Sequence, residues 1–212
     1  GESGYEVEPE TLAEIILGLQ NQGCHNINFV TPTHVVPQII AGVLIAATAG
    51  LRIPLVYNTG GYDSLEMLKL LAGVIDIYMP DIKYANQETA KRYSKIADYP
   101  KINQAALKEM HRQVGDLEID TRGIATRGLL VRHLVLPNDL GCTALLMRFL
   151  AEQISPNTYL NLMDQYHPAY RAHRYSELNR RLTRAEYKAA LEMAEQAGLT
   201  RLDQRSRFSF LF

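Results

Sequence analysis

Short apolar segments alternate along the chain with longer segments in which apolar residues recur every three or four positions. The short runs are typical of strands, and the longer periodic segments are typical of helices. Strands are predicted over His25–Val30, Ile53–Tyr57, Val74–Met79, Gly128–Leu136 and Thr158–Met163. Helices are predicted near 8–23, 34–49, 65–71, 87–96, 102–114, 143–153 and 183–198. Strands separated by helices pair in parallel through right-handed crossovers, so the pattern predicts an α/β fold.

Two connections between these elements contain polar residues suited to particular roles. Thr31–His34 separates the first strand from its helix, and its threonine hydroxyls are expected to cap that helix. Asn58–Ser64 follows the second strand and contains two glycines, so we expect a loop there.

The most informative stretch is Asp76–Tyr84, in which an apolar strand ends in two alternating charges, Asp81 and Lys83. Residues two apart on an extended chain point to the same face. Charges are costly inside a buried strand, but the carboxyl ends of the strands in α/β barrels are where ligands bind. We therefore expect Asp81 and Lys83 to belong to a binding site.

Composition restricts the class of protein. The chain has 212 residues, enough for one α/β domain, whereas a complete eight-unit barrel takes about 250. Lys and Arg number 22 against 23 Asp and Glu, which gives no reason to expect a nucleic-acid or membrane partner. Cys24 and Cys142 are far apart in sequence and are expected to be reduced thiols. We expect a cytoplasmic protein.

Three motifs together resemble a known family. They are Asn58–Gly61 with Gly60, Met79–Lys83 one unit later, and Gln165–His167. In order and spacing they resemble the S-adenosylmethionine site of the pyruvate formate-lyase activating enzymes. The whole of Gly4 to Asp203 is similar to their uncharacterised radical SAM relatives, most distinctively in Asn26–His34 and Tyr57–Tyr62.

The resemblance implies a partial (β/α)6 TIM-like barrel of the radical SAM type. In that family a [4Fe-4S] cluster reductively cleaves S-adenosylmethionine to a 5′-deoxyadenosyl radical. An electron donor such as flavodoxin or ferredoxin supplies the electron for this cleavage. The resemblance implies that the enzyme activates a glycyl-radical-type protein or modifies an unknown substrate. That substrate is either a protein or a small molecule.

The resemblance also assigns candidate cofactor-binding residues. The positions of Asn58, Thr59, Met79 and Asp81 lie around the methionine end of S-adenosylmethionine, some through a monovalent cation. Those of Lys83 and His167 contact its carboxylate and its ribose or adenine.

Three further residues are weaker candidates. Thr31 and Thr33 stand where the family has a glycine-rich stretch that meets the methionine amino group, and they offer hydroxyls instead. Arg132 lies between apolar residues on a strand and is a secondary candidate for a carboxylate of the substrate or ligand.

The chain departs from the family where the cluster should be held. The first strand and the CxxxCxxC loop do not occur in it, and we expect both upstream of Gly1. We accordingly expect residues 1–203 to form a radical SAM core truncated at its N-terminus. Residues 204–212 form a phenylalanine-rich tail with no functional interpretation.

Two other functions fit the same residues. Lys83 on a barrel strand is also the pattern of a Schiff-base lyase of the aldolase type. A barrel without its cluster loop is alternatively a non-catalytic module that binds a nucleotide-like ligand or a protein.

Overall fold

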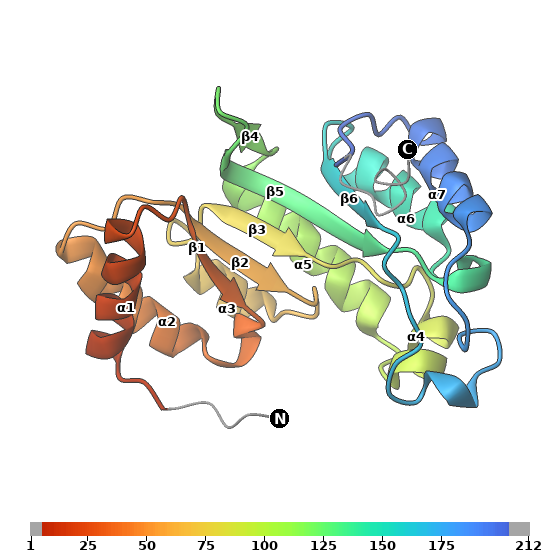
Figure 1. Cartoon of the computed structure of the whole chain (residues 1–212), viewed down its shortest axis with the longest axis horizontal. Helices are drawn as coiled ribbons and strands as arrows, with labels where there is room; N and C mark the ends of the chain where they lie inside the picture. Colours follow the sequence, from red (N-terminus) through yellow and green to blue (C-terminus); the bar gives the residue numbers. More distant parts are fainter. Residues whose placement is uncertain (1–5, 204–212) are drawn as a thin grey trace.

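A computed structural model describes residues 6–203 and shows a parallel sheet that does not close into a barrel (Figure 1). Its parallel strands lie side by side in chain order, with β4 (Glu118–Ile119) added antiparallel to the start of β5. The parallel strands are β1 (Ile27–Val30), β2 (Leu55–Thr59), β3 (Ile77–Pro80), β5 (Ala125–Leu134) and β6 (Tyr159–Met163). This arrangement is a partial TIM-like fold, as the sequence predicted.

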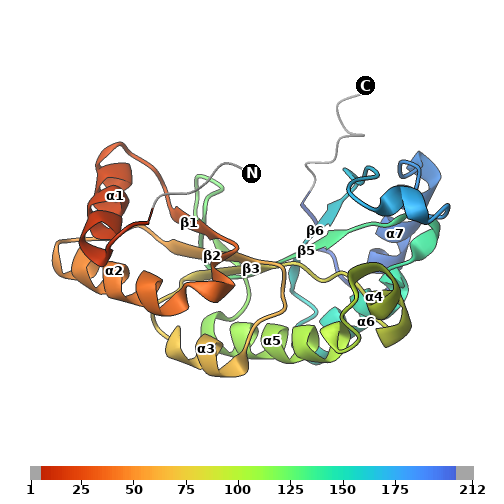
Figure 2. The same cartoon turned by 90° about the horizontal axis from the view of Figure 1, so that it is seen from below.

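Helices follow the strands and lie mainly along one side of the curved sheet, as α3 and α5 show most clearly in Figure 2. None of the helices in residues 6–203 has the length and apolar content needed to cross a membrane. The α-helices are α1 (Pro9–Asn21), α2 (Val36–Thr48), α3 (Leu65–Leu70), α4 (Gln87–Ser94), α5 (Tyr99–Val114), α6 (Thr143–Phe149) and α7 (Arg184–Gln196). Shorter helical turns are η1 (Pro32–His34), η2 (Pro137–Asp139), η3 (Leu150–Ile154) and η4 (Ala172–Arg174).

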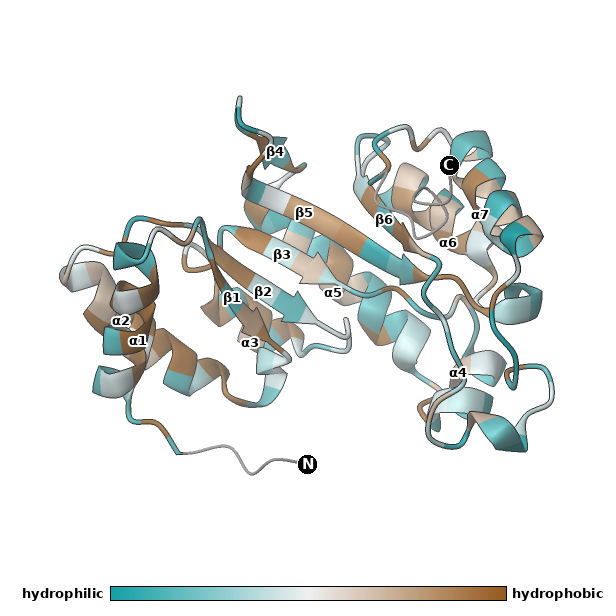
Figure 3. Ribbon diagram, viewed as in Figure 1, coloured by the Kyte–Doolittle hydropathy of each residue, from teal (hydrophilic) through white to brown (hydrophobic). Residues whose placement is uncertain are grey.

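Strand alternation separates a packed face from an inner face. On β5, Val131 and His133 are fully buried toward the helices, whereas Arg132 between them is only half-buried on the opposite face. The same alternation buries Tyr57 and Tyr78 in the main core. Figure 3 shows hydrophilic segments near the carboxyl ends of β2 and β5. The inner face therefore carries Arg132, whereas His133 is a polar group buried on the packed face.

The two edges of the parallel sheet differ. Within residues 6–203, β1 pairs with β2 alone, and Val30 on it is 66% exposed. The outer edge of β6 is covered by residues 201–203, through the bridge between Leu160 and Leu202. The β1 side of the sheet is therefore open within the described residues. The phenylalanine-rich tail at 204–212 lies outside them.

Several predicted boundaries were wrong for identifiable reasons. The second strand starts at Leu55, because Pro54 has no N–H to donate to the ladder, and it continues through Asn58 and Thr59, which were predicted in a loop. The third starts at Ile77, because Val74 and Ile75 still donate to Leu71 at the end of the preceding helix.

The predicted helix 143–153 ends as an α-helix at Phe149 and continues as the wider turn η3, in which Ser155 N bonds to the carbonyl of Leu150. The predicted threonine cap of α2 was also wrong. That helix begins at Val36 without a side-chain cap, and the Thr33 hydroxyl donates to Asp63 instead.

Candidate functional site

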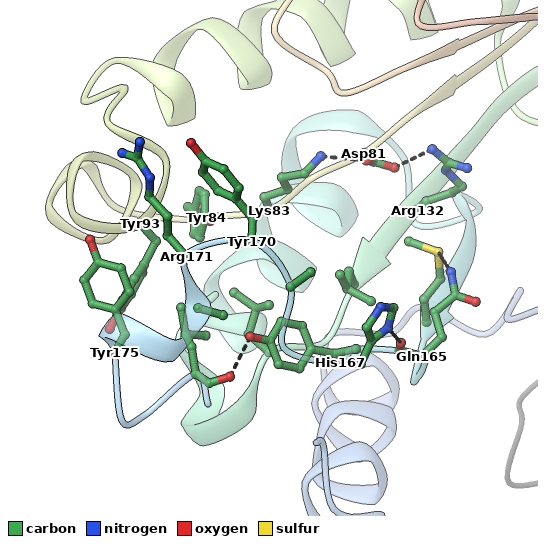
Figure 4. A pocket seen from close by; sticks show the side chains of 17 residues that line it. Asp81, Lys83, Tyr84, Tyr93, Arg132, Gln165, His167, Tyr170, Arg171 and Tyr175 are labelled. Carbon is green, nitrogen blue, oxygen red and sulfur yellow. Dashed lines mark hydrogen bonds and ion pairs between the residues drawn. The ribbon is translucent and has the colours of Figure 1, made fainter. Parts of the chain in front are cut away.

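Charged side chains meet beyond the carboxyl end of β3 and beside β5. Lys83 Nζ donates to Asp81 Oδ2 at 2.6 Å, and Arg132 Nη2 forms an ion pair with Asp81 Oδ1 at 2.7 Å. Figure 4 shows the two cations on opposite sides of the one carboxylate. Asp81 and Arg132 are also neighbours in the sheet, because a parallel bridge joins them. This cluster carries a net charge of plus one before any ligand is present.

The cluster lines a cavity of about 550 Å³. Its wall is rich in tyrosine, and Asp81 is its only acidic lining residue within residues 6–203, against the basic residues Lys83, Arg132 and Arg171. Further lining residues include Tyr84, Tyr93, Leu134, Met163, Gln165, Tyr166, His167, Tyr170 and Tyr175. A cavity in which two cations share one carboxylate and aromatic rings form the wall suits a ligand that carries a carboxylate group and a planar ring.

The segment 164–178 after β6 forms one side of this cavity. The Tyr166 hydroxyl fixes it internally by donating to the Leu178 carbonyl at 2.8 Å. Glu177 ties it to α4, because it accepts from the Tyr93 hydroxyl at 2.8 Å and pairs with Arg92. Burial, with the neighbouring Glu177 carboxylate, raises the pKa of Tyr93 to about 12. Tyr93 therefore stays a neutral hydrogen-bond donor at physiological pH.

His167 lies on the same segment and is exposed at the cavity. Its Nδ1 is 3.4 Å from the Gln165 carbonyl. In Figure 4 it lies on the side of the cavity nearer Arg132, whereas Tyr93, Tyr175 and Arg171 lie across from it. The imidazole edge is free to reach a ligand from that side.

A buried histidine supports the charged cluster from behind. His133 Nδ1 lies 2.7 Å from the Ile82 carbonyl, and Nε2 lies 3.1 Å from Thr143 Oγ1. Since a carbonyl only accepts, Nδ1 carries the proton and Nε2 accepts from the hydroxyl. Burial lowers the pKa of His133, so the ring is neutral. Ile82 stands between Asp81 and Lys83, and His133 therefore fixes the backbone that carries both charges.

A second polar cluster lies under the end of β2. Asp63, which is 2% exposed, accepts hydrogen bonds from the hydroxyls of Thr33, Thr59 and Tyr57 at 2.8, 2.7 and 3.0 Å. Burial, together with the charge of Asp63, raises the pKa of Tyr57. Hydroxyl donors thus surround a buried carboxylate and join β2 to η1.

The structure gathers some of the predicted site residues and separates others. Asp81, Lys83, Arg132 and His167 all line the cavity. Gly60 is adjacent, because a Cβ atom built on it would lie 3.8 Å from Lys83 Nζ.

The remaining predicted residues lie beside the cavity, at the ends of β1, β2 and β3. The hydroxyls of Thr33 and Thr59 are directed to Asp63. Thr31 N donates to the Asn58 carbonyl at 2.8 Å, and Asn58 is in register with Met79.

The described residues do not fit an iron–sulfur cluster. Cys24 lies between α1 and β1, whereas Cys142 precedes α6, and its Sγ accepts from Asn86 Nδ2 at 3.3 Å. Within residues 6–203, no group of three or more His, Cys, Asp or Glu side chains is placed to hold a metal ion.

The structure is similar to that of HydG, which is described as a maturase of the [FeFe]-hydrogenase. The match has a TM-score of 0.55 at 12% identity and covers 95% of this chain and 45% of HydG. At that identity the likeness shows the fold alone.

In sequence, the chain is 34% identical over 194 residues to the uncharacterized protein MJ0674 of Methanocaldococcus jannaschii. The match covers 90% of this chain and 52% of that protein, so the chain spans about half the length of this relative. No protein-family model matches the chain.

Several residues of the site escaped the sequence prediction. Asp63 was assigned to a loop, and its hydroxyl partners come from separate elements, so no local pattern marks it. Tyr99 and Asn103 lie at the start of α5, and both contact the backbone around the site. Their spacing of four residues, which places both on one side of a helix, was the available signal.

Proposed function

We propose that this chain is the S-adenosylmethionine-binding core of a radical SAM enzyme. The observation that carries the proposal is the Lys83–Asp81–Arg132 cluster at the carboxyl ends of β3 and β5, which opens onto the tyrosine-walled cavity. The resemblance of the motifs around Gly60, Asp81 and His167 supports the same ligand, and the fold shared with HydG is compatible with it.

The cavity residues fit the parts of S-adenosylmethionine. Lys83 donates one hydrogen bond to Asp81, and an ammonium has three N–H groups, so two remain for a ligand carboxylate. Asp81 offers an acceptor for the ligand ammonium or for a bridging cation, and the tyrosine wall offers faces for the adenine ring. At about 550 Å³ the cavity is within the roughly 300–1,000 Å³ of small-molecule sites.

In radical SAM enzymes the bound cofactors supply a carbon-centred radical. This chain's residues would hold and orient S-adenosylmethionine, and the cluster ligands would come from a segment outside the described residues. The resemblance of the motifs to those of the pyruvate formate-lyase activating enzymes favours a protein or small-molecule substrate and an external electron donor.

The geometry disfavours the Schiff-base alternative. A lysine that attacks a carbonyl must be neutral, and such lysines are desolvated or lie beside another cation. Lys83 and Arg132 are separated by the Asp81 carboxylate, to which Lys83 donates at 2.6 Å, so the charge nearest to Lys83 is an anion and not a second cation. Its side chain is 35% exposed, so desolvation is limited.

Calorimetric titration with S-adenosylmethionine, S-adenosylhomocysteine and adenosine tests the proposal without any cluster. The first two carry the amino-acid carboxylate, whereas adenosine does not. We expect both to bind, and adenosine to bind at least about tenfold more weakly, because one charge-assisted hydrogen bond is missing. Absence of binding by all three, or equal binding by adenosine, would contradict the proposal.

A further inference from the structure

We infer that Tyr99 and Asn103 of α5 are positioning residues for the candidate site. Neither is among its lining residues. Together they fix the Asp81 backbone to the loop after β2. By holding that backbone they determine the position of the Asp81 carboxylate, with which Lys83 and Arg132 both pair. The inference rests on the proposed function for its ligand, although its structural part is testable without one.

Both side chains donate to backbone carbonyls of the site. Asn103 Nδ2 donates to the carbonyls of Asp81 and Gly61, each at 2.9 Å. The Tyr99 hydroxyl lies 3.1 Å from the Gly60 carbonyl and 3.3 Å from that of Asp81. The two side chains are 1% and 4% exposed, so water does not compete for these bonds. Burial raises the pKa of Tyr99, which keeps its hydroxyl protonated as a donor.

These bonds replace a ladder bond that the sheet cannot make. Asp81 N still donates to the Thr59 carbonyl at 2.9 Å, in the normal parallel pattern. The next N–H along β2 would be that of Gly61, but it turns away and bonds to Thr59 Oγ1 at 3.2 Å. The Asp81 carbonyl would therefore be buried without a partner, at a cost of about 1–3 kcal/mol. Asn103 and Tyr99 supply the missing donors.

Gly61 shows how closely the loop and the Asp81 backbone approach. Its φ is +76°, and a Cβ atom built on it would lie 2.2 Å from both Asn103 Nδ2 and the Asp81 carbonyl oxygen. No side chain fits between them. The contact between the end of β2 and the end of β3 thus depends on a glycine on one side and on the Asn103 amide on the other.

The orientation of Asn103 points to a role beyond packing. Both of its partners are acceptors, so the side-chain nitrogen must face them, and Oδ1 is left buried without a partner. An unsatisfied buried oxygen costs stability. That cost is tolerated where both amide donors are used to hold the backbone of the charged cluster.

The test compares two variants on α5 with a matched control on β3, whose hydroxyl also contacts α5. Asn103→Leu removes both donors at similar size, and Tyr99→Phe removes one hydroxyl. Tyr78→Phe is the control, because the Tyr78 hydroxyl is buried, donates to Gln113 on α5 at 2.7 Å and lies away from the cavity. If Asn103→Leu does not fold, Tyr99→Phe carries the test.

Two measurements are made on each protein. In titrations with S-adenosylmethionine we expect affinity to fall about tenfold in Asn103→Leu, less in Tyr99→Phe, and not at all in Tyr78→Phe. In amide hydrogen exchange without ligand, we expect faster exchange at Asp81 and Gly61 in the first two variants only.

The outcomes separate the two claims. If the unaltered chain binds no S-adenosylmethionine, the proposed function fails, and the exchange data alone decide the positioning role. Unchanged exchange at Asp81 in both variants would overturn the inference. If the unaltered chain does bind S-adenosylmethionine, unchanged affinity in both Asn103→Leu and Tyr99→Phe would also overturn the inference.

Discussion

Replacement of Lys83 by methionine is the substitution whose outcome the structure specifies most fully. Methionine keeps much of the stem and removes the charge. In the parent, the ammonium is one of two cations on Asp81, and the Arg132 ion pair at 2.7 Å remains after the change. Asp81 is therefore not left as an unpaired charge.

The magnitudes follow from this geometry. Lys83 is 35% exposed, and an ion pair with that much solvent contributes about 0–1 kcal/mol, so the melting temperature should change little. A charge-assisted hydrogen bond from Lys83 to a ligand carboxylate is worth roughly 1.5–3 kcal/mol. Because Lys83 also serves Asp81, we expect the lower end, a loss of about tenfold in affinity for S-adenosylmethionine.

The assay is calorimetric titration of parent and variant with S-adenosylmethionine, with a thermal melt of each protein. Adenosine, which lacks the carboxylate, is the internal control and should bind both proteins equally. A variant that melts well below the parent and binds with unchanged affinity would show that Lys83 is only structural. That result would refute the assignment.

Four further outcomes are expected. Asp81→Asn should weaken S-adenosylmethionine binding and, unlike Lys83→Met, also lower the melting temperature, since Lys83 and Arg132 lose their shared counter-ion; an unchanged melt would contradict this. Asp63→Asn should destabilise the fold by about 1–3 kcal/mol in denaturant titration, because one amide oxygen cannot serve three hydroxyls as a carboxylate does. The pKa of His133 is lowered in the folded protein, so as pH falls the histidine takes up a proton in the unfolded chain before it does so in the folded one. Stability should therefore decline below about pH 6.5, and it should decline less in His133→Gln. Thermal melts across that pH range would show this. The 1–212 chain should stay colourless and iron-free after anaerobic reconstitution, because its two cysteines, Cys24 and Cys142, lie in separate units; a stoichiometric [4Fe-4S] absorbance would contradict this.

Local patterns were sufficient to predict the parallel strands and the placement of Asp81 and Lys83 on one face. Asp81 and Lys83 are two apart after an apolar strand, and the expected common face is what the structure shows. Arg132, between apolar neighbours on β5, was a secondary candidate for binding a carboxylate, and the structure places it at the cavity, paired with Asp81. Each of these inferences needed only the alternation of one strand.

Features that depend on contacts between distant elements could not be predicted in this way. Asp63 is marked only by its hydroxyl partners, and Thr33 lies 30 residues before it in the chain. The helix predicted from Ile102 begins at Tyr99, because Pro100 falls in its first turn, where proline is tolerated. That error left Tyr99 outside the predicted helix.

A crystal structure of the chain grown with S-adenosylmethionine would show whether the cavity beside Asp81 and Lys83 holds that ligand. We expect the ligand carboxylate within hydrogen-bond distance of Lys83 Nζ and the adenine among the tyrosines that line the cavity. A ligand bound elsewhere on the chain, with the Lys83–Asp81–Arg132 cluster untouched, would contradict this expectation.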